Sequence, residues 1–126
     1  MRKDTQNWVE LAEYDGADRM AQTTPELEQI IWRFRGQLEK MGIHAEQVML
    51  YGSQLTGSAR EGSDIDLIVI SNDWANLSQR ERLELLGIAA ARILEPVQAQ
   101  GFTPAEISRR SLAPFWEHII EQAVAV

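Results

Sequence analysis

The sequence has no cysteine among its 126 residues. This absence excludes a disulfide scaffold, a zinc ribbon, an iron–sulfur site and a thiol nucleophile, and it suits a reducing compartment. The first residues, MRKDTQN, lead into no apolar stretch of the kind found in a signal peptide, so no secretory signal is predicted. The longest aliphatic run, Leu67–Ile70, is far shorter than the ~20 residues of a membrane span. We therefore expect a cytoplasmic protein without membrane segments.

Basic side chains are also scarce. Lysine and arginine number 12 against 19 aspartates and glutamates, which gives a net charge of −7. An acidic surface repels phosphate backbones, so broad nucleic-acid binding is excluded. A single nucleotide remains compatible, because a cation and a few backbone amides can balance its charge locally. A hydrophobic content of 44% in a chain of this length predicts one globular domain with its own core.

The chain divides into a short N-terminal segment and one domain. Residues 1–22 are predicted to be an appendage with helical spacing of apolar residues, and residues 23–126 the domain. Thr24 is a predicted N-cap and Pro25 the first residue of a helix, in which apolar residues recur at helical spacing. Gly42 is expected to follow the end of this helix.

Further helices alternate with short apolar strands. Ser78 and Glu81 form a predicted capping box that opens a second helix, which ends before Pro96. A last helix is expected around Trp116. The alternation of strands and helices predicts an α/β (α+β) architecture, a small sheet with helices packed on it. The predicted strands are Gln47–Tyr51, Asp64–Ile70 and Val97–Thr103.

Two aspartates begin the second predicted strand. Asp64 and Asp66 are two residues apart, so their carboxylates project from one face of a strand, while Ile65 and Leu67 project from the other. Two neighbouring carboxylates repel each other, and a divalent cation relieves that repulsion. Mg²⁺ commonly takes one or two carboxylates together with substrate phosphates. The pair therefore predicts a metal site, although an Asp-x-Asp sequence alone is also a common surface pair.

A glycine and a serine end the first predicted strand. Gly52 has no side chain, so another group can approach its backbone closely, and Ser53 offers a hydroxyl and an amide. A short helix after Ser53 would add exposed amides that favour an anion. Ten residues separate Ser53 from Asp64. Gly-Ser alone is a common turn, but together with two carboxylates it predicts a site for a metal-bound nucleoside triphosphate.

These motifs resemble the Gly-Ser-x₁₀-Asp-x-Asp signature of the polymerase-β-like nucleotidyltransferase superfamily, and in particular its minimal nucleotidyltransferase (MNT) branch. The resemblance implies a small mixed β-sheet with packed helices, ATP or another nucleoside triphosphate as co-substrate, and Mg²⁺ as cofactor. It implies that Gly52 and Ser53 hold the β/γ-phosphates and that Asp64 and Asp66 are catalytic metal ligands. The metals would stabilise the attacking and leaving oxygens of an in-line displacement.

Two loop residues between the motifs, Arg60 and Ser63, are further candidates for nucleotide binding, with a solvated loop arginine as the alternative for Arg60. The resemblance also implies a third carboxylate on the next strand, where Gln98 stands in this chain. Glutamine is neutral, so it binds Mg²⁺ weakly and cannot act as a base. Glu95 and Glu106 lie nearby in sequence and are expected at the ends of that strand.

Many MNT proteins act as antitoxins that transfer AMP to a tyrosine of a HEPN-domain ribonuclease. The resemblance therefore implies a transferase that uses Mg²⁺-ATP and acts on a HEPN-type partner. The alternative is a weak or inactive nucleotide-binding module that neutralises its partner without transfer, which Gln98 favours. Transfer to a small molecule such as an aminoglycoside is a third reading, for which the chain is short. A homo-oligomer is compatible with all three.

Overall fold

The computed structural model describes residues 23–60 and 62–126, so the predicted appendage at residues 1–22 lies outside the described residues. None of the described helices has the length and apolar character needed to cross a membrane. The elements follow in the order α2 (Pro25–Lys40), β1 (Gln47–Tyr51), α3 (Ser53–Thr56), β2 (Ile65–Ile70), the 3₁₀ helix η1 (Asn72–Trp74), α4 (Gln79–Ile93), β3 (Val97–Phe102), α5 (Pro104–Ser108), α6 (Pro114–Gln122) and β4 (Val124–Ala125).

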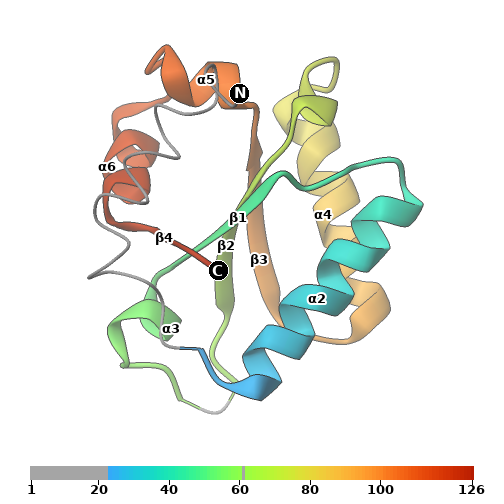
Figure 1. Cartoon of the computed structure of the whole chain (residues 1–126), viewed down its shortest axis with the longest axis vertical. Helices are drawn as coiled ribbons and strands as arrows, with labels where there is room; N and C mark the ends of the chain where they lie inside the picture. The colour runs from blue at the N-terminus through green and yellow to red at the C-terminus, as the bar shows by residue number, and fades with distance from the viewer. Residues whose placement is uncertain (1–22, 61) are drawn as a thin grey trace.

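The strands form one mixed sheet in the order β3-β2-β1-β4 (Figure 1). β1 is antiparallel to both β2 and β4, whereas β2 and β3 are parallel and joined by the crossover through α4. The C-terminal end of β1 therefore lies at the same edge of the sheet as the N-terminal ends of β2 and β3. This mixed sheet with packed helices confirms the predicted fold class.

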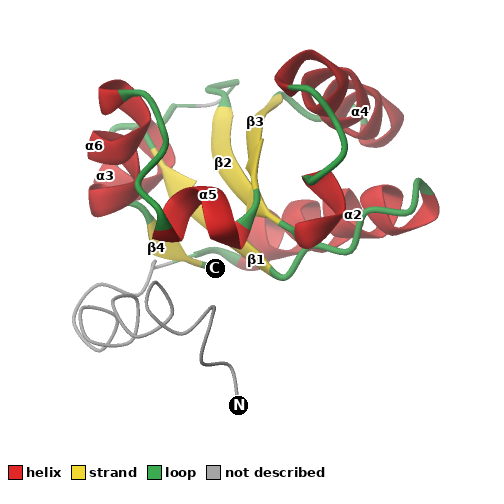
Figure 2. Cartoon of the chain, turned by 90° about the horizontal axis from the view of Figure 1, so that it is seen from above, coloured by secondary structure: helices red, strands yellow, loops and turns green. Residues whose placement is uncertain are grey.

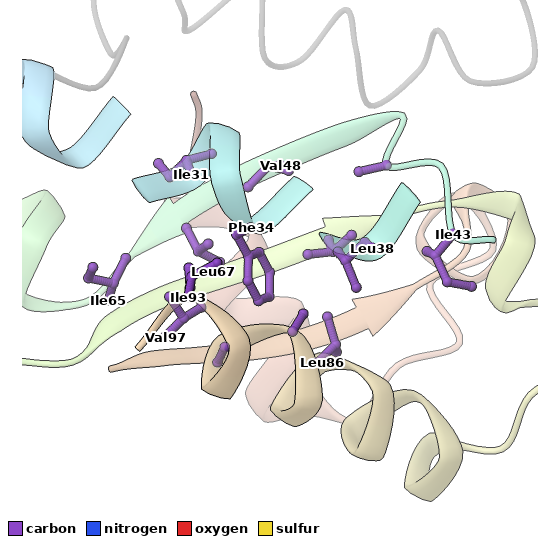
Figure 3. Packing of buried hydrophobic residues seen from close by; sticks show 14 of the residues in the cluster. Ile31, Phe34, Leu38, Ile43, Val48, Ile65, Leu67, Leu86, Ile93 and Val97 are labelled. Carbon is purple, nitrogen blue, oxygen red and sulfur yellow. The ribbon is translucent and has the colours of Figure 1, made fainter. Parts of the chain in front are cut away.

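Helices α2 and α4 cover one face of the sheet (Figure 2). Phe34 and Leu38 of α2 are fully buried against sheet residues such as Leu67, and Leu86 of α4 joins the same core (Figure 3). Each of these side chains contributes about 1.5–3 kcal/mol when it is removed from water. Their spacing of three and four residues is the helical periodicity that the sequence shows.

The other face of the sheet carries a smaller core under α5 and α6. Met49, Ile68 and Phe102 project from the strands into this core. Trp116 of α6 packs edge-on against Phe102, with ring centroids 5.6 Å apart, and against Tyr51, at 6.0 Å. At the edge where β1 ends, Asp66 is partly exposed and Gln98 is exposed, so these polar side chains remain accessible beside α6.

The helix starts agree with the sequence predictions. The Thr24 hydroxyl accepts a hydrogen bond from the Leu27 amide, and Ser78 and Glu81 form the predicted capping box. β2 begins one residue later than predicted and β3 ends one residue earlier, because Asp64 and Thr103 lie just outside the ladder of hydrogen bonds. The sequence analysis did not predict α5 and β4.

A buried ion pair holds the far end of β3 to α4. Arg82 is 4% exposed and donates hydrogen bonds to both carboxylate oxygens of Glu106, at 2.9 and 3.0 Å. It also donates to the Leu77 and Gly101 carbonyls. Glu106 in turn caps α5 by accepting from the Thr103 amide. The pair therefore fixes the corner where the strand meets α5.

We expect Glu106→Gln to lower the free energy of unfolding by about 1–3 kcal/mol, because Arg82 loses its charged partner. Burial alone would raise the pKa of Glu106, but hydrogen bonds from Arg82 and Thr103 and the charge of Arg82 outweigh burial and lower it below its ordinary value of 4.5. The wild-type pair thus stabilises the fold above pH 4.5 and loses this contribution as the pH falls through the folded pKa. Urea unfolding at neutral and acidic pH should therefore show a difference between the two proteins that shrinks in acid.

Candidate functional site

The motif residues meet at one edge of the sheet. Gly52 directly follows β1, Asp64 directly precedes β2, and Asp66 and Gln98 are second residues of their strands. The antiparallel register pairs Tyr51 with Asp66, and the parallel register pairs Asp66 with Gln98. Residues paired across a sheet project from the same face. Tyr51, Asp66 and Gln98 therefore share the face opposite α2 and α4.

The turn after β1 depends on Gly52. Its φ of 79° and ψ of −152° lie in a region that is essentially restricted to glycine. Gly52 is also the N-cap of α3, and its carbonyl accepts hydrogen bonds from the Leu55 and Thr56 amides. Gly57 then ends α3 in the left-handed conformation, at φ 80° and ψ 8°. The predicted turn with a short helix is thus present, and it places Ser53 at the first turn of α3.

Asp66 lies directly beside Gly52. A Cβ atom added to Gly52 would collide with the Oδ2 atom of Asp66 and would lie 3.1 Å from its Cγ. The sequence analysis expects phosphate to approach the backbone of Gly52, and the structure shows that a methyl group added here would meet the Asp66 carboxylate. The missing side chain of Gly52 therefore makes room for Asp66.

The two aspartates repel each other, as the sequence predicts. Burial raises the pKa of Asp66 above its ordinary value, and the charge of Asp64 raises it further. Ile65 and Leu67 are buried on the other face of the sheet, so the predicted alternation is also present. Among the described residues, Asp66 forms no ion pair with a basic side chain. A partly buried carboxylate of this kind, with a second carboxylate close by, fits a divalent cation, whose charge would offset the repulsion.

Tyr51, the last residue of β1, packs against the smaller core and is also a neighbour of the site that the sequence analysis did not name as a site residue. Burial raises the pKa of its phenol to about 12, and the charge of Asp66 contributes to this shift. The phenol is therefore protonated at neutral pH. Trp116 packs edge-on against the Tyr51 ring, so α6 forms one side of the site. Tyr51 is two residues after Met49, which faces the smaller core, and side chains two residues apart in a strand share a face. This alternation could have placed Tyr51 on the same face as the site.

Gln98 lies where the resemblance implies a third carboxylate, next to Asp66 and exposed to solvent. The two acids near it in sequence are bound elsewhere. Glu95 forms an ion pair with Arg33 of α2, at 3.2 Å, and Glu106 is bound to Arg82 beyond the opposite end of β3. In the part of the chain that the structure describes, histidines and acidic residues form no cluster of three or more suited to a metal. Among the described residues, the acidic candidates for a metal at this edge are therefore Asp64 and Asp66.

Arg60 and Ser63, the two candidates in the loop, form hydrogen bonds with each other. The Ser63 hydroxyl accepts a hydrogen bond from the Arg60 amide at 2.8 Å, and the Ser63 amide donates to the Arg60 carbonyl at 2.9 Å. This pair closes the loop just before Asp64. The Arg60 residue is exposed, and its role in nucleotide binding stays a prediction.

Gly52→Ala is expected to lower the affinity for a magnesium nucleotide by more than it lowers stability. The disallowed backbone conformation costs about 1–3 kcal/mol of folding free energy. Rotation of the Asp66 side chain can relieve the collision, so the fold survives while a metal ligand is displaced. Denaturant unfolding and titration calorimetry with Mg²⁺-ATP measure the two effects on the same sample.

Gly57→Ala is the matched control, because Gly57 has almost the same φ but an added Cβ would meet no described atom within 4 Å. This change should cost about 1–2 kcal/mol of stability through the left-handed backbone alone. Its nucleotide affinity should stay close to that of the wild type. Equal losses of affinity in the two variants would contradict the role of the Gly52–Asp66 contact.

A family model matches the part of the chain that holds the candidate site. The family model described as a nucleotidyltransferase domain matches residues 29–98, which include the turn at Gly52, both aspartates and Gln98. Members of this family generally use divalent metal ions. No curated protein matches the chain significantly. A Sulfolobus solfataricus crystal structure described as a "putative nucleotidyltransferase" is 17% identical, with 84% of this chain and 89% of that chain covered and a TM-score of 0.48. Since the family model covers more than half of the sequence, the chain belongs to the nucleotidyltransferase domain family.

Proposed function

We propose that this chain transfers AMP from Mg²⁺-ATP to a hydroxyl group, and that the acceptor is a tyrosine on a HEPN-type partner protein. The observation that carries the transfer is the contact between Gly52 and Asp66, with Asp64 close enough to raise the pKa of Asp66. The HEPN partner and the antitoxin role are supported by the sequence resemblance to MNT proteins, and a cytoplasmic location is supported by the lack of cysteine.

The proposed residues divide the work of one displacement. Asp64 and Asp66 would hold Mg²⁺, which supplies positive charge to the phosphate oxygens when it is bound. The turn at Gly52 and Ser53 would hold the β- and γ-phosphates. The acceptor oxygen forms a bond to the α-phosphorus, the bond from the α-phosphorus to the bridging oxygen breaks, and pyrophosphate leaves. The hydroxyl proton passes to solvent or to a base on the acceptor, since Gln98 is neutral.

The test uses ATP labelled either at the α- or at the γ-phosphate, incubated with Mg²⁺, the full chain and the product of the neighbouring gene. We expect label from the α position on the partner and none from the γ position, with mass spectrometry locating AMP on a tyrosine. The Asp64→Asn/Asp66→Asn variant is the control. Transfer of the γ label would show phosphorylation instead and would contradict the proposal.

A second candidate function is a nucleotide-binding module that neutralises its partner without chemistry. The exposed Gln98 beside Asp66 favours it, because the residues that the structure describes place neither a third carboxylate ligand nor a carboxylate base beside Asp66 on β3. This function predicts Mg²⁺-ATP binding and a stable complex with the partner, but no label from either position. Inhibition of the partner that needs no ATP hydrolysis or transfer would support it.

A further inference from the structure

Helix α2 carries an exposed row of four residues on the side that faces away from the core. Glu28, Trp32, Gly36 and Lys40 follow one another at intervals of four residues, and all four are exposed. Residues at this interval form one continuous ridge along a helix. Trp32 is 72% exposed, an unusual state for so large an apolar side chain. The row thus combines an acidic end, a tryptophan, a glycine and a basic end.

Gly36 has no explanation within the described chain. It lies in the interior of α2, where glycine weakens a helix relative to alanine. An added Cβ at Gly36 would meet no described atom within 4 Å outside its own helix. No tight packing or left-handed backbone therefore requires glycine at this position. Gly36 has no side chain and lies one helical turn from the exposed Trp32. It therefore leaves a hollow in the ridge that could hold a large aromatic ring.

The order of charges in the row is self-complementary. Glu28 and Lys40 are equally far from the midpoint of the row, as are Trp32 and Gly36. If two copies of this row lie antiparallel about a twofold axis, Glu28 meets Lys40 of the partner subunit and Trp32 meets Gly36 of the partner subunit. Both contacts then occur twice, as an isologous interface requires. A parallel arrangement would instead bring like charges together.

We propose that α2 is the contact surface of a homodimer in which Trp32 of each copy packs over Gly36 of the partner subunit. Interdigitating ridges of this kind cross at an angle of about 50°. Tryptophan is among the residues that most often dominate binding at protein interfaces. The dimer is independent of the proposed transfer reaction, because α2 packs on the face of the sheet opposite Asp66.

A competing occupant lies close by. A groove of about 340 Å³ runs beside Trp32 and is also lined by Ala125, Val126 and Thr23. Thr23 is where residues 1–22 join the described domain, so this segment could cover Trp32 within one chain. The charge pattern favours a second copy, since Glu28 and Lys40 have complementary positions only across a twofold axis.

Sedimentation equilibrium of the full chain over a range of micromolar concentrations tests the dimer. We expect a monomer–dimer equilibrium in the wild type, and an increase in the dimer Kd of about tenfold or more in Trp32→Ala. Glu28→Lys and Lys40→Glu should each weaken the dimer, and the two changes together should restore it, because the swap recreates both pairs. Failure of the double variant to recover would overturn the proposed pairing.

Gly36→Ala separates dimerisation from folding. The added methyl should raise the thermal stability of the monomer, since it favours the helix, and should weaken the dimer by filling the hollow. Gly87→Ala is the matched control, because Gly87 is an exposed interior glycine of α4 that also has open space around it. It should raise stability without changing the Kd. If Gly87→Ala weakens the dimer and Gly36→Ala does not, the proposal is wrong. The proposal is also wrong if the wild type stays a monomer and its Trp32 is protected from hydroxyl-radical oxidation at every concentration.

Discussion

Replacing both aspartates in Asp64→Asn/Asp66→Asn is expected to abolish Mg²⁺-dependent ATP binding and to reduce nucleotidyl transfer by at least about a thousandfold. Charge stabilisation by a bound metal contributes several kcal/mol to such reactions, and each 1.36 kcal/mol changes the rate about tenfold. Calorimetry with Mg²⁺-ATP measures the binding, and incorporation of α-labelled AMP measures the transfer. Binding of unchanged affinity in the double variant would contradict the metal assignment.

The same variant should be at least as stable as the wild type when no metal is present. Burial and the charge of Asp64 raise the pKa of Asp66, so the folded chain holds a proton on Asp66 more tightly than the unfolded chain does. This group contributes stability below its unfolded pKa and loses that contribution as the pH rises through its folded pKa. Asparagine at position 66 does not titrate, so the variant does not lose this stability as the pH rises. A thermal unfolding midpoint at neutral pH that is clearly lower in the variant would contradict the repulsion seen in the structure.

The opposite effects on binding and stability distinguish a functional carboxylate pair from an ordinary surface pair. A surface pair without a ligand would change neither property much, because exposed charges contribute little to stability. A structural residue would lower stability when it is replaced. Here we expect a bound cation to offset the repulsion between Asp64 and Asp66. Circular dichroism of the variant should therefore remain that of the native fold.

Local signals predicted the helices that begin at recognisable caps. Thr24 followed by Pro25 fixed the start of α2, and the pair Ser78 and Glu81 fixed the start of α4, because these side chains satisfy amides that are otherwise unpaired. Thr103 and Glu106 form the same kind of box at α5. That helix was missed because the apolar run of β3 was extended through Thr103.

Non-local contacts account for what the sequence could not predict. β4 has two residues, and it exists because Val124 pairs with Leu50 far away in the chain. The burial of Arg82 depends on Glu106, which is 24 residues away. The collision between an added Cβ at Gly52 and Asp66 likewise depends on the exact register between β1 and β2, which the spacing of the two motifs does not specify.

The candidate site was more predictable than its surroundings, because its signal is a spacing along the chain. Gly52, Ser53 and the two aspartates lie on either side of one turn, so a strand-turn-strand pattern brings them together. Placing Gln98 required the further step of aligning a third strand. The parallel register of β2 and β3 gives it Asp66 as its direct neighbour. Its role in catalysis stays a prediction.

Gln98→Glu is expected to raise the rate of AMP transfer by about 10²–10⁴-fold, the usual contribution of a general base. The new carboxylate would lie on the same face as Asp66 and in solvent contact, where an acceptor hydroxyl can reach it. Affinity for Mg²⁺-ATP should change little, since Asp64 and Asp66 already hold the nucleotide metal in this scheme. Mass spectrometry of the partner protein over time measures the transfer rate.

Gln100→Glu is the matched control for this substitution. Gln100 lies two residues further along β3, so it shares the face of Gln98, but it pairs with Ile68 rather than with Asp66. It adds the same charge to the same strand at a position outside the carboxylate pair, and it should leave the transfer rate unchanged. Equal acceleration by both variants would mean that the added negative charge, and not its position beside Asp66, is responsible.

Rapid transfer by the wild type, with Gln98→Ala equally fast, would contradict the view that Gln98 limits catalysis. The structure restricts what could then supply the base. Glu95 lies at the same edge as Asp66 but is ion-paired with Arg33 on the side of α2, and Glu106 is bound to Arg82 at the other end of β3. The phenol of Tyr51 is next to Asp66, but its pKa of about 12 keeps it protonated. Because the described residues offer no other base at this edge, we expect the base under that outcome to come from the acceptor protein, and transfer to a free tyrosine derivative should then be much slower than transfer to the intact partner.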